Sequence, residues 1–336
     1  MKRVTIADVA AQAGVSKSTV SHALSGKRPI SAATRRRIHL AVDQLGYQPN
    51  PVAQRLAGGK THTIGYVFPL YAPQIASLEM KFITSTANVI NAADYAFMML
   101  THPIHDVDSL QRFVASGLVD GFILMQVQLE DPRVRLLQRT RTPFVLVGRC
   151  ADNDGVSFVD LDIAAAMARC VEYLTDLGHV SIAYLHQEDM AFGFVFRAYH
   201  ELLAACRQRG VALHTHACDS IEMCGAEAMR QMLEQHPEVT AVIAWNSTVA
   251  WGAIQAAQEN GRQIPRDLSI IAFGDSGLTP QAALQLTVLD IRPEPMAAQA
   301  AQMLLASLAH EPPPEPQVLI APDLIVRDST AVARPV

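Results

Sequence analysis

Apolar side chains recur at helical spacing in three stretches of the first 47 residues. Thr5, Ser16 and Ser31 stand where N-caps are expected, and Asp8 completes a capping-box pattern with Thr5. Gly14 supplies a sterically permissive corner between the first two helices. The pattern predicts a helix–turn–helix followed by a third helix, although an ordinary helical hairpin has the same spacing. The expected inner faces are, in chain order, Ile6, Val9, Ala10 and Ala13, then Val20, Ala23 and Leu24, then Ile38, Ala41, Val42 and Leu45.

After residue 60 the pattern changes to short apolar runs separated by amphipathic stretches. The runs expected to be strands are IGYVF, YAFMML, GFILM and FVLVG in one series, and SIAYL, LHTHA, TAVIAW, SIIAF and LTVLD in a second. Helices are expected between them, among others at residues 75–92, 108–116 and 131–140. Apolar strands that alternate with helices predict parallel sheets covered on both faces, and two series predict two similar α/β subdomains. Ligands of such folds bind at the carboxyl ends of the strands.

The segment QPNPVAQRLAGGK joins the two regions. It can be a plain linker, or a hinge helix that is too short to be stable alone and orders on DNA. In the second case Asn50, Ala53 and Leu56 are the expected DNA contacts, with Leu56 as an apolar wedge and Asn50 as a polar reader in the minor groove.

Charge sets the first 60 residues apart from the rest of the chain. They hold 10 Lys and Arg against Asp8 and Asp43, whereas the whole 336-residue chain has a formal net charge of −5. A basic head on an acidic body points to a polyanion as the partner of the head alone. Together with the helix–turn–helix pattern, this balance favours contact with DNA phosphates.

Composition points to a cytoplasmic protein. No apolar run of 18 or more residues indicates a membrane span, and the N-terminus has no apolar signal core. The five cysteines lack CxxC spacing, so we expect reduced thiols rather than disulfides or a zinc site.

The second helix supplies the predicted base contacts, because the N-terminal part of a recognition helix reaches base edges in the major groove. Lys17 can donate to guanine O6 and N7, while Arg35 to Arg37 would hold phosphates and set the register. The DNA contacts predicted in the head are Thr5, Ser16, Lys17, Ser18, Thr19, Ser21, His22 and Arg35.

The run VTIADVAAQAGVSKSTVSHAL, followed by TRRRI, LGYQPN and AQRLA, resembles the head and hinge of the lactose/galactose-repressor (LacI/GalR) family. The resemblance continues more loosely to the closing PDLIVRDST. It implies an all-α helix-turn-helix head plus an α/β periplasmic-binding-protein-like body of two doubly wound parallel-sheet subdomains. The expected domains are residues 1–47 for the head and 48–60 for the hinge. The first subdomain is expected at residues 61–160 and 291–319, and the second at 161–290 and 320–330.

The same resemblance implies function. It implies that the protein is a homodimeric transcriptional repressor, which binds a pseudo-palindromic operator. A small, sugar-like effector in the cleft between the subdomains is expected to control it. No coiled-coil heptads follow the last strand, so we expect a dimer and not a tetramer.

Effector-binding residues follow from matching the family position by position, and Met125 beside Gln126 is a further candidate. The sequence departs from the family at Val195, where an arginine is usual, and at Ser247 and Gly274, where acidic residues are usual. The remaining polar residues can rearrange to bind a sugar, or the ligand can be less sugar-like. Alternatively no small effector is used, and the regulator responds to a protein co-regulator or acts without a ligand. The aromatic residues either stack on a sugar ring or simply pack. The implied effector-binding residues are Tyr71, Gln74, Gln126, Arg149, Phe192, Phe194, Arg197, Trp245, Asn246, Asp275 and Asp290.

No pattern supports catalysis, since GxSxG, GxxxxGK[ST] and HExxH are absent from the sequence. The pairs His102/His105 and His214/His216 lack acidic or thiol ligands at suitable spacing, so we expect surface histidines, no metal and no cofactor. The main alternative of another class is a periplasmic sugar-binding module, against which the basic head and the missing signal peptide argue.

Overall fold

The computed structural model describes residues 4–25, 30–47, 60–70, 77–218, 222–274, 284–311 and 315–334. The chain divides into two compact units, residues 1–63 with 108–120 and residues 64–107 with 121–336. The helical head lies in the first unit. Both β-sheets lie in the second, except for Thr63 at the start of the first strand.

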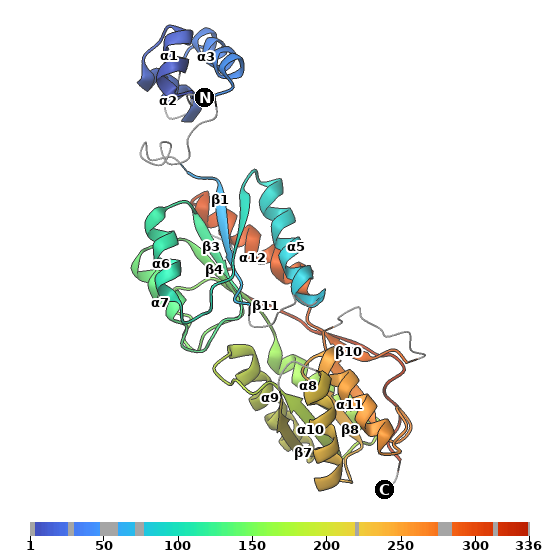
Figure 1. The fold of residues 1–336 in the computed structure, drawn as a ribbon. Coiled ribbons are helices and arrows are strands. Elements are labelled where there is room, and N and C mark those ends of the chain that lie inside the picture. Colours follow the sequence, from blue (N-terminus) through green and yellow to red (C-terminus); the bar gives the residue numbers. More distant parts are fainter. Residues whose placement is uncertain are drawn as a thin grey trace. The chain divides into compact units, whose positions relative to one another are not determined.

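Three short helices form the head: α1 (Ile6–Ala13), α2 (Lys17–Ser25) and α3 (Ala32–Leu45), drawn in blue in Figure 1. The predicted inner faces are confirmed, because they form one apolar cluster around the fully buried Val9, Val20 and Ile38. Gly14 has φ 64° and ψ 41°, the left-handed conformation that glycine adopts without strain. The turn between α1 and α2 therefore has the predicted cause.

The first sheet has the strand order β11-β5-β4-β3-β1-β2. Its strands are β1 (Thr63–Val67), β2 (Ala96–Leu100), β3 (Gly121–Leu124), β4 (Phe144–Val147), β5 (Phe158–Leu161) and β11 (Gln317–Ile320). The second unit holds α5 (Ser77–Ala92), α7 (Pro132–Arg139) and α12 (Pro293–Leu308) in this part of the chain, while α6 (Val107–Ser116) lies in the first unit from Asp108 on. Helices α5 and α12 pack side by side against one face of the sheet (Figure 1).

The second sheet has the strand order β12-β10-β9-β8-β6-β7. Its strands are β6 (Ser181–His186), β7 (Ala212–Ala217), β8 (Ala241–Ala244), β9 (Ser269–Phe273), β10 (Thr287–Asp290) and β12 (Asp323–Ile325). Its helices are α8 (Ile163–Asp176), α9 (Gly193–Arg209), α10 (Glu222–Gln235) and α11 (Ser247–Glu259).

Alternate residues of the central strands of the second sheet pack against different helices. Val242 and Ala244 of β8 face α10 and α11, whereas Ala241 and Ile243 face α8 and α9. This two-residue period is why the central strands read as continuous apolar runs in the sequence. Both faces are covered, as in a doubly wound α/β fold.

Each predicted apolar run contains a strand, but the sequence missed β5 and β11. Both have four residues, and a polar residue, Asp160 or Gln317, weakens their apolar pattern. The second sheet is also not wholly parallel, because β12 pairs antiparallel with β10. No helix among the described residues is long and apolar enough to span a membrane.

Candidate DNA-binding and effector-binding sites

Three predicted base readers form a hydroxyl cluster at the start of α2. Ser16 Oγ accepts the Thr19 backbone N–H at 3.1 Å and lies 2.8 Å from both Ser18 Oγ and Thr19 Oγ1. Ser16 therefore caps the helix as expected. The hydroxyls of Ser16 and Ser18 bond to each other, so the exposed Lys17 is the group best placed to reach a base, and the exposed Ser18 can do so by giving up that bond.

Thr5 is engaged in the same way at the start of α1. Its N–H and its hydroxyl both donate to Asp8 Oδ2, at 2.8 and 2.7 Å. This is the predicted capping pair, and it fixes the N-terminus of α1.

The remaining predicted DNA contacts differ in exposure. Ser21 and His22 are half-buried on α2, while Arg35 to Arg37 are exposed on α3. Asn50, Ala53 and Leu56 of the hinge lie outside the described residues. Lys17, Ser18 and the arginines of α3 are therefore among the exposed polar side chains of the described head.

Asp120 holds the chain where it leaves the hinge segment. Its carboxylate accepts the backbone N–H of Thr61, the Thr61 hydroxyl and the backbone N–H of His62, each at 2.8 Å. His62 has φ 50°, a conformation that costs free energy in a non-glycine residue. The carboxylate therefore holds Thr61 and His62 in place within the first unit.

The predicted effector residues that the structure describes lie mostly where parallel strands end. Gln126 follows β3, Arg149 follows β4, and Trp245 follows β8. Phe192, Phe194 and Arg197 lie at the start of α9. Tyr71, Gln74 and Asp275 lie outside the described residues.

Three of these side chains hold buried polar atoms that lack hydrogen-bond partners among the described residues. They are Gln126 Oε1, Arg197 Nε and Trp245 Nε1. An unsatisfied buried donor or acceptor costs about 1–3 kcal/mol, so such atoms call for a polar partner. A ligand hydroxyl meets that requirement.

Sequence reasoning missed Asp160, which lies between two of the predicted arginines. Its Oδ2 is 3.2 Å from Arg149 Nε and 3.7 Å from Arg197 Nη2, and its side chain is 4% exposed. Burial raises the pKa of Asp160 to about 6, although Arg197 and Arg149 lower it. A carboxylate inside an apolar run, FVDL, is the signal that could have revealed it.

Arg197, on α9 of the second subdomain, also forms hydrogen bonds to the first subdomain. Its Nη2 donates to the Arg149 carbonyl at 2.5 Å and its Nη1 to the Cys150 carbonyl at 3.4 Å. Nearby, Gly193 N–H donates to the Val127 carbonyl at 3.0 Å. A Cβ on Gly193 would lie 2.5 Å from the Arg149 carbonyl oxygen, so this close approach of backbones requires glycine.

Arg133 supports the turn that carries Gln126. It is 2% exposed, and its Nη2 donates to the Met125 and Gln126 carbonyls at 3.0 and 3.1 Å. Gln126 has φ 52°, so its backbone needs such external support. The buried carboxylate of Asp131 pairs with the same guanidinium at 2.6 Å.

Two other predicted ligands carry capping bonds. Asn246 Oδ1 accepts the Val249 N–H at 2.7 Å as the N-cap of α11. Asp290 Oδ1 accepts the Arg292 N–H at 2.9 Å. Phe194 packs edge-on against Phe273, with ring centroids 6.2 Å apart, which favours the packing role for this aromatic ring.

The three departures from the family pattern are all built into the packing. Val195 is 3% exposed in the second subdomain. Ser247 donates its hydroxyl to the Gly274 carbonyl at 2.7 Å. A Cβ on Gly274 would lie 2.9 Å from a methyl carbon of Leu78 on α5. Leu78 would have to shift to admit a side chain there, and the φ of 66° at Gly274 itself favours glycine.

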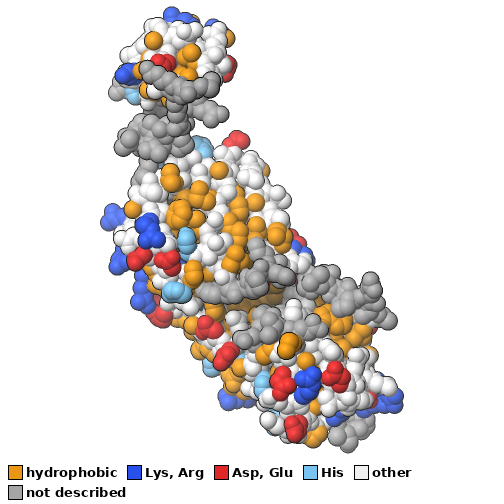
Figure 2. All heavy atoms as spheres, viewed as in Figure 1, with side chains coloured by type: hydrophobic (Ala, Val, Ile, Leu, Met, Phe, Trp, Pro, Cys, Tyr) orange, Lys and Arg blue, Asp and Glu red, His pale blue; other side chains and the backbone are white. Residues whose placement is uncertain are grey.

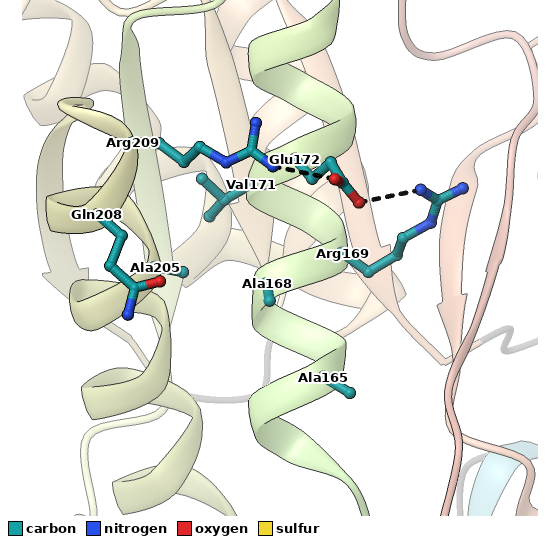
Figure 3. Close-up of a pocket in the computed structure, with 8 residues that line it drawn as sticks. All are labelled: Ala165, Ala168, Arg169, Val171, Glu172, Ala205, Gln208 and Arg209. Carbon is teal, nitrogen blue, oxygen red and sulfur yellow. Dashed lines mark hydrogen bonds and ion pairs between the residues drawn. The ribbon is translucent and has the colours of Figure 1, made fainter.

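A hollow of about 270 Å³ lies elsewhere, between α8 and α9 (Figure 3). Glu172 in its wall pairs with Arg209 at 2.9 Å and with Arg169 at 3.3 Å. Because these helices cover a face of the second sheet and the charges are paired within the wall, the hollow is not part of the strand-end site.

Comparison with known proteins gives a consistent match. Residues 5–50 match bacterial regulatory proteins of the lacI family, and residues 171–330 match the periplasmic binding protein-like domain. The transcriptional regulator MalR of Streptomyces coelicolor is 31% identical, covering 98% of this chain and 97% of its own.

Solved structures agree with the fold. The lac repressor dimer bound to operator and the anti-inducer ONPF superposes with a TM-score of 0.80 at 23% identity, covering 98% of this chain and 100% of that one. The complex of the transcriptional regulator CelR with cellobiose has a TM-score of 0.73 at 24% identity, covering 97% and 100%.

Proposed function

Because this chain belongs to the LacI family of DNA-binding transcriptional regulators, we propose that it represses transcription as a dimer on a pseudo-palindromic operator, under the control of a small sugar-like effector. We further propose that it acts in the cytoplasm, with residues 1–47 as the head, 48–60 as the hinge, 61–160 with 291–319 as the first subdomain and 161–290 with 320–330 as the second.

The capped recognition helix is the observation that carries the DNA-binding role. Ser16 fixes the start of α2 and leaves Lys17 and Ser18 exposed at the end that enters a major groove. Arg35 to Arg37 on α3 would hold phosphates. The hinge would insert Leu56 from each subunit into the minor groove.

Operator selection from random DNA, followed by binding titrations, tests this assignment. Lys17→Ala should relax preference at one base pair of each half-site, at about 1–3 kcal/mol per lost base contact. Arg36→Ala is the matched control, since losing a phosphate contact weakens all sequences alike and reduces the salt dependence. A uniform loss with Lys17→Ala would make Lys17 a phosphate contact.

The hinge has its own test. Leu56→Ala should weaken operator binding far more than non-specific binding, because the wedge acts only on kinked DNA. Equal loss on both kinds of DNA would remove the wedge from the mechanism.

The proposed effector site combines the strand-end residues Gln126, Arg149, Trp245 and Asn246 with Arg197 of α9. The unpartnered buried atoms of Gln126, Arg197 and Trp245 support a ligand with several hydroxyl groups. The cellobiose bound by CelR, a protein of the same fold, is such a ligand.

Effector binding would act through the contacts between subdomains. The ligand would favour one arrangement of the Arg197 and Gly193 contacts, and so bias a two-state equilibrium of the dimer that sets the spacing of the hinges. Asp120, which anchors the residues after the hinge, would transmit that spacing.

A thermal-shift screen with cellobiose, other disaccharides, sugar phosphates and nucleosides tests the site. A ligand at 100 times its Kd adds about 2.7 kcal/mol, which gives a clear rise in Tm. Arg197→Ala should abolish the rise, whereas Arg209→Ala, an exposed arginine on the same helix, should keep it. A rise that survives Arg197→Ala would place the ligand elsewhere.

Dimerisation is supported by an apolar surface. Figure 2 shows hydrophobic side chains gathering on the face of the first subdomain that carries β1 and α5, and Met80 on α5 is 43% exposed. A second copy of the chain would cover this face. Sedimentation should show a dimer, and Met80→Glu should shift it toward monomer.

A second candidate function keeps DNA binding but uses a protein co-regulator as the signal. The buried Val195 and the tightly packed Gly274, which replace polar residues of the family pattern, favour it. If no compound in the panel raises the Tm while operator binding is intact, the result would favour this alternative or regulation without a ligand.

A further inference from the structure

Two imidazoles and a carboxylate meet at the outer edge of the second sheet. His214 lies on the edge strand β7, and His236 and Glu238 lie on the link between α10 and β8. His214 Nε2 and His236 Nδ1 are each 3.4 Å from the same oxygen, Glu238 Oε1. The three ligand atoms all lie within 4.8 Å of one another.

His214 was expected to be a surface histidine, but the structure shows that its side chain is mostly buried. Its side chain is only 18% exposed, and its Nε2 is buried without a hydrogen-bond partner among the described residues. The acidic ligand that the sequence pattern lacked comes from residue 238, brought in by the parallel pairing of β7, β6 and β8.

The spacing suits a shared metal better than hydrogen bonds. Nitrogen–oxygen hydrogen bonds span about 2.7–3.2 Å, less than the two distances of 3.4 Å. Two ligands of one tetrahedral zinc ion, each about 2.0–2.1 Å from it, lie about 3.3 Å apart. We propose that His214, His236 and Glu238 bind a zinc ion, with water as the fourth ligand.

The exposure of two ligands and the arrangement of the two imidazole rings indicate how a zinc ion would reach the site. His236 and Glu238 are 36% and 47% exposed, so the site opens to solvent. The two imidazole rings are stacked with centroids 3.7 Å apart, whereas two imidazoles on one tetrahedral ion have centroids about 5 Å apart. The exposed His236 ring must therefore turn about its Nδ1 on binding, so that the rings separate while the Nδ1–Glu238 spacing is kept, and the mostly buried His214 stays in place.

The zinc site is separate from the effector site. Glu238 precedes β8 at its amino end, whereas the proposed effector residues follow the carboxyl ends of the strands. Bound zinc would therefore cross-link the edge strand β7 to the α10–β8 link through its protein ligands. Its presence or absence does not depend on the proposed repressor function.

Calorimetric titration of the EDTA-treated full chain with zinc chloride tests the proposal. We expect one zinc per chain, and binding weakened more than about tenfold by either His214→Ala or His236→Ala. His102→Ala is the matched control, since His102 is an exposed histidine paired with an acid, Asp106, and should leave binding unchanged. Absence of binding, or binding that survives the His214→Ala/His236→Ala double variant, would overturn the proposal.

Two further measurements separate ligand loss from misfolding and from thiol binding. Glu238→Gln removes the anionic ligand at an exposed position, so it should weaken zinc binding while the Tm in EDTA stays that of the wild type. Cobalt substitution should give the visible bands of a tetrahedral nitrogen–oxygen site. A thiolate-to-cobalt charge-transfer band would assign the ion to Cys218 or Cys224 and refute the histidine site.

Discussion

Arg133 and Asp131 form an ion pair that water does not reach, and replacing Arg133 by methionine isolates its contribution. The side chains are 2% and 0% exposed. Arg133 Nε and Nη2 donate to the carboxylate at 3.0 and 2.6 Å, and Nη2 also donates to the Met125 and Gln126 carbonyls. Methionine keeps much of the apolar volume, so the change mainly removes the charge and the donors.

The expected cost follows from what remains. In Arg133→Met the buried Asp131 carboxylate keeps only two backbone donors among the bonds described, Gln128 N–H at 3.2 Å and residue 133 N–H at 3.0 Å. Removing one partner of a buried ion pair costs about 3–5 kcal/mol. Asp131→Asn/Arg133→Met removes both charges and keeps the helix cap, so it should cost less, about 1–3 kcal/mol for the orphaned carbonyls.

Hydrogen exchange of residues 125–139, measured by mass spectrometry, is the suitable assay, because it reports local stability in a chain of several domains. A loss of 3–5 kcal/mol corresponds to exchange about two to four orders of magnitude faster. Arg135→Met on the same helix is the control, since Arg135 and Glu130 are 65% and 73% exposed and their pair contributes about 0–1 kcal/mol.

Two results would refute this reasoning. Arg133→Met could exchange no faster than Arg135→Met, which would mean that burial does not strengthen the pair. The double variant could also lose at least as much as Arg133→Met alone, which would mean that the isolated carboxylate is not the main cost.

Further predictions concern the subdomain contact and pH. Gly193→Ala should lower the Tm by the equivalent of about 1–3 kcal/mol, because its Cβ would overlap the Arg149 carbonyl. Burial raises the pKa of Asp160 to about 6, so the unfolded chain loses that proton first. The stability of the wild type relative to Asp160→Asn should therefore fall by about 2 kcal/mol as the pH rises from 4 to 6, and a flat difference in pH-dependent melting would contradict the burial. Burial lowers the pKa of His179, whose Nδ1 lies 2.9 Å from the Thr240 hydroxyl and whose Nε2 lies 3.1 Å from the Ala331 carbonyl. The folded state then resists protonation, so stability should fall as the pH drops below 6.5, and His179→Gln should flatten that slope.

The sequence by itself determined the local elements and the family. The caps at Thr5 and Ser16, the left-handed Gly14 and the apolar runs of the sheets are set by neighbouring residues, whose preferences and periods can be read directly. The motif around α2 then identified the regulator family, because the order of its residues is specific. Short strands with a polar residue, such as β5, gave too weak a period to be recognised.

Only the tertiary structure decided which distant polar groups meet. Asp160 reaches Arg197, and His214 reaches Glu238, through strand pairing and helix packing that join residues tens of positions apart. No sequence period encodes such contacts, because they depend on strand order and on which face of a helix turns toward the other subdomain. The same packing set the exposure that raises the pKa of Asp160 and leaves the Trp245 indole N–H buried without a partner among the described residues. The chemistry of the proposed effector site and of the histidine cluster is therefore a property of the fold, while the identity of the DNA-binding head is a property of the sequence.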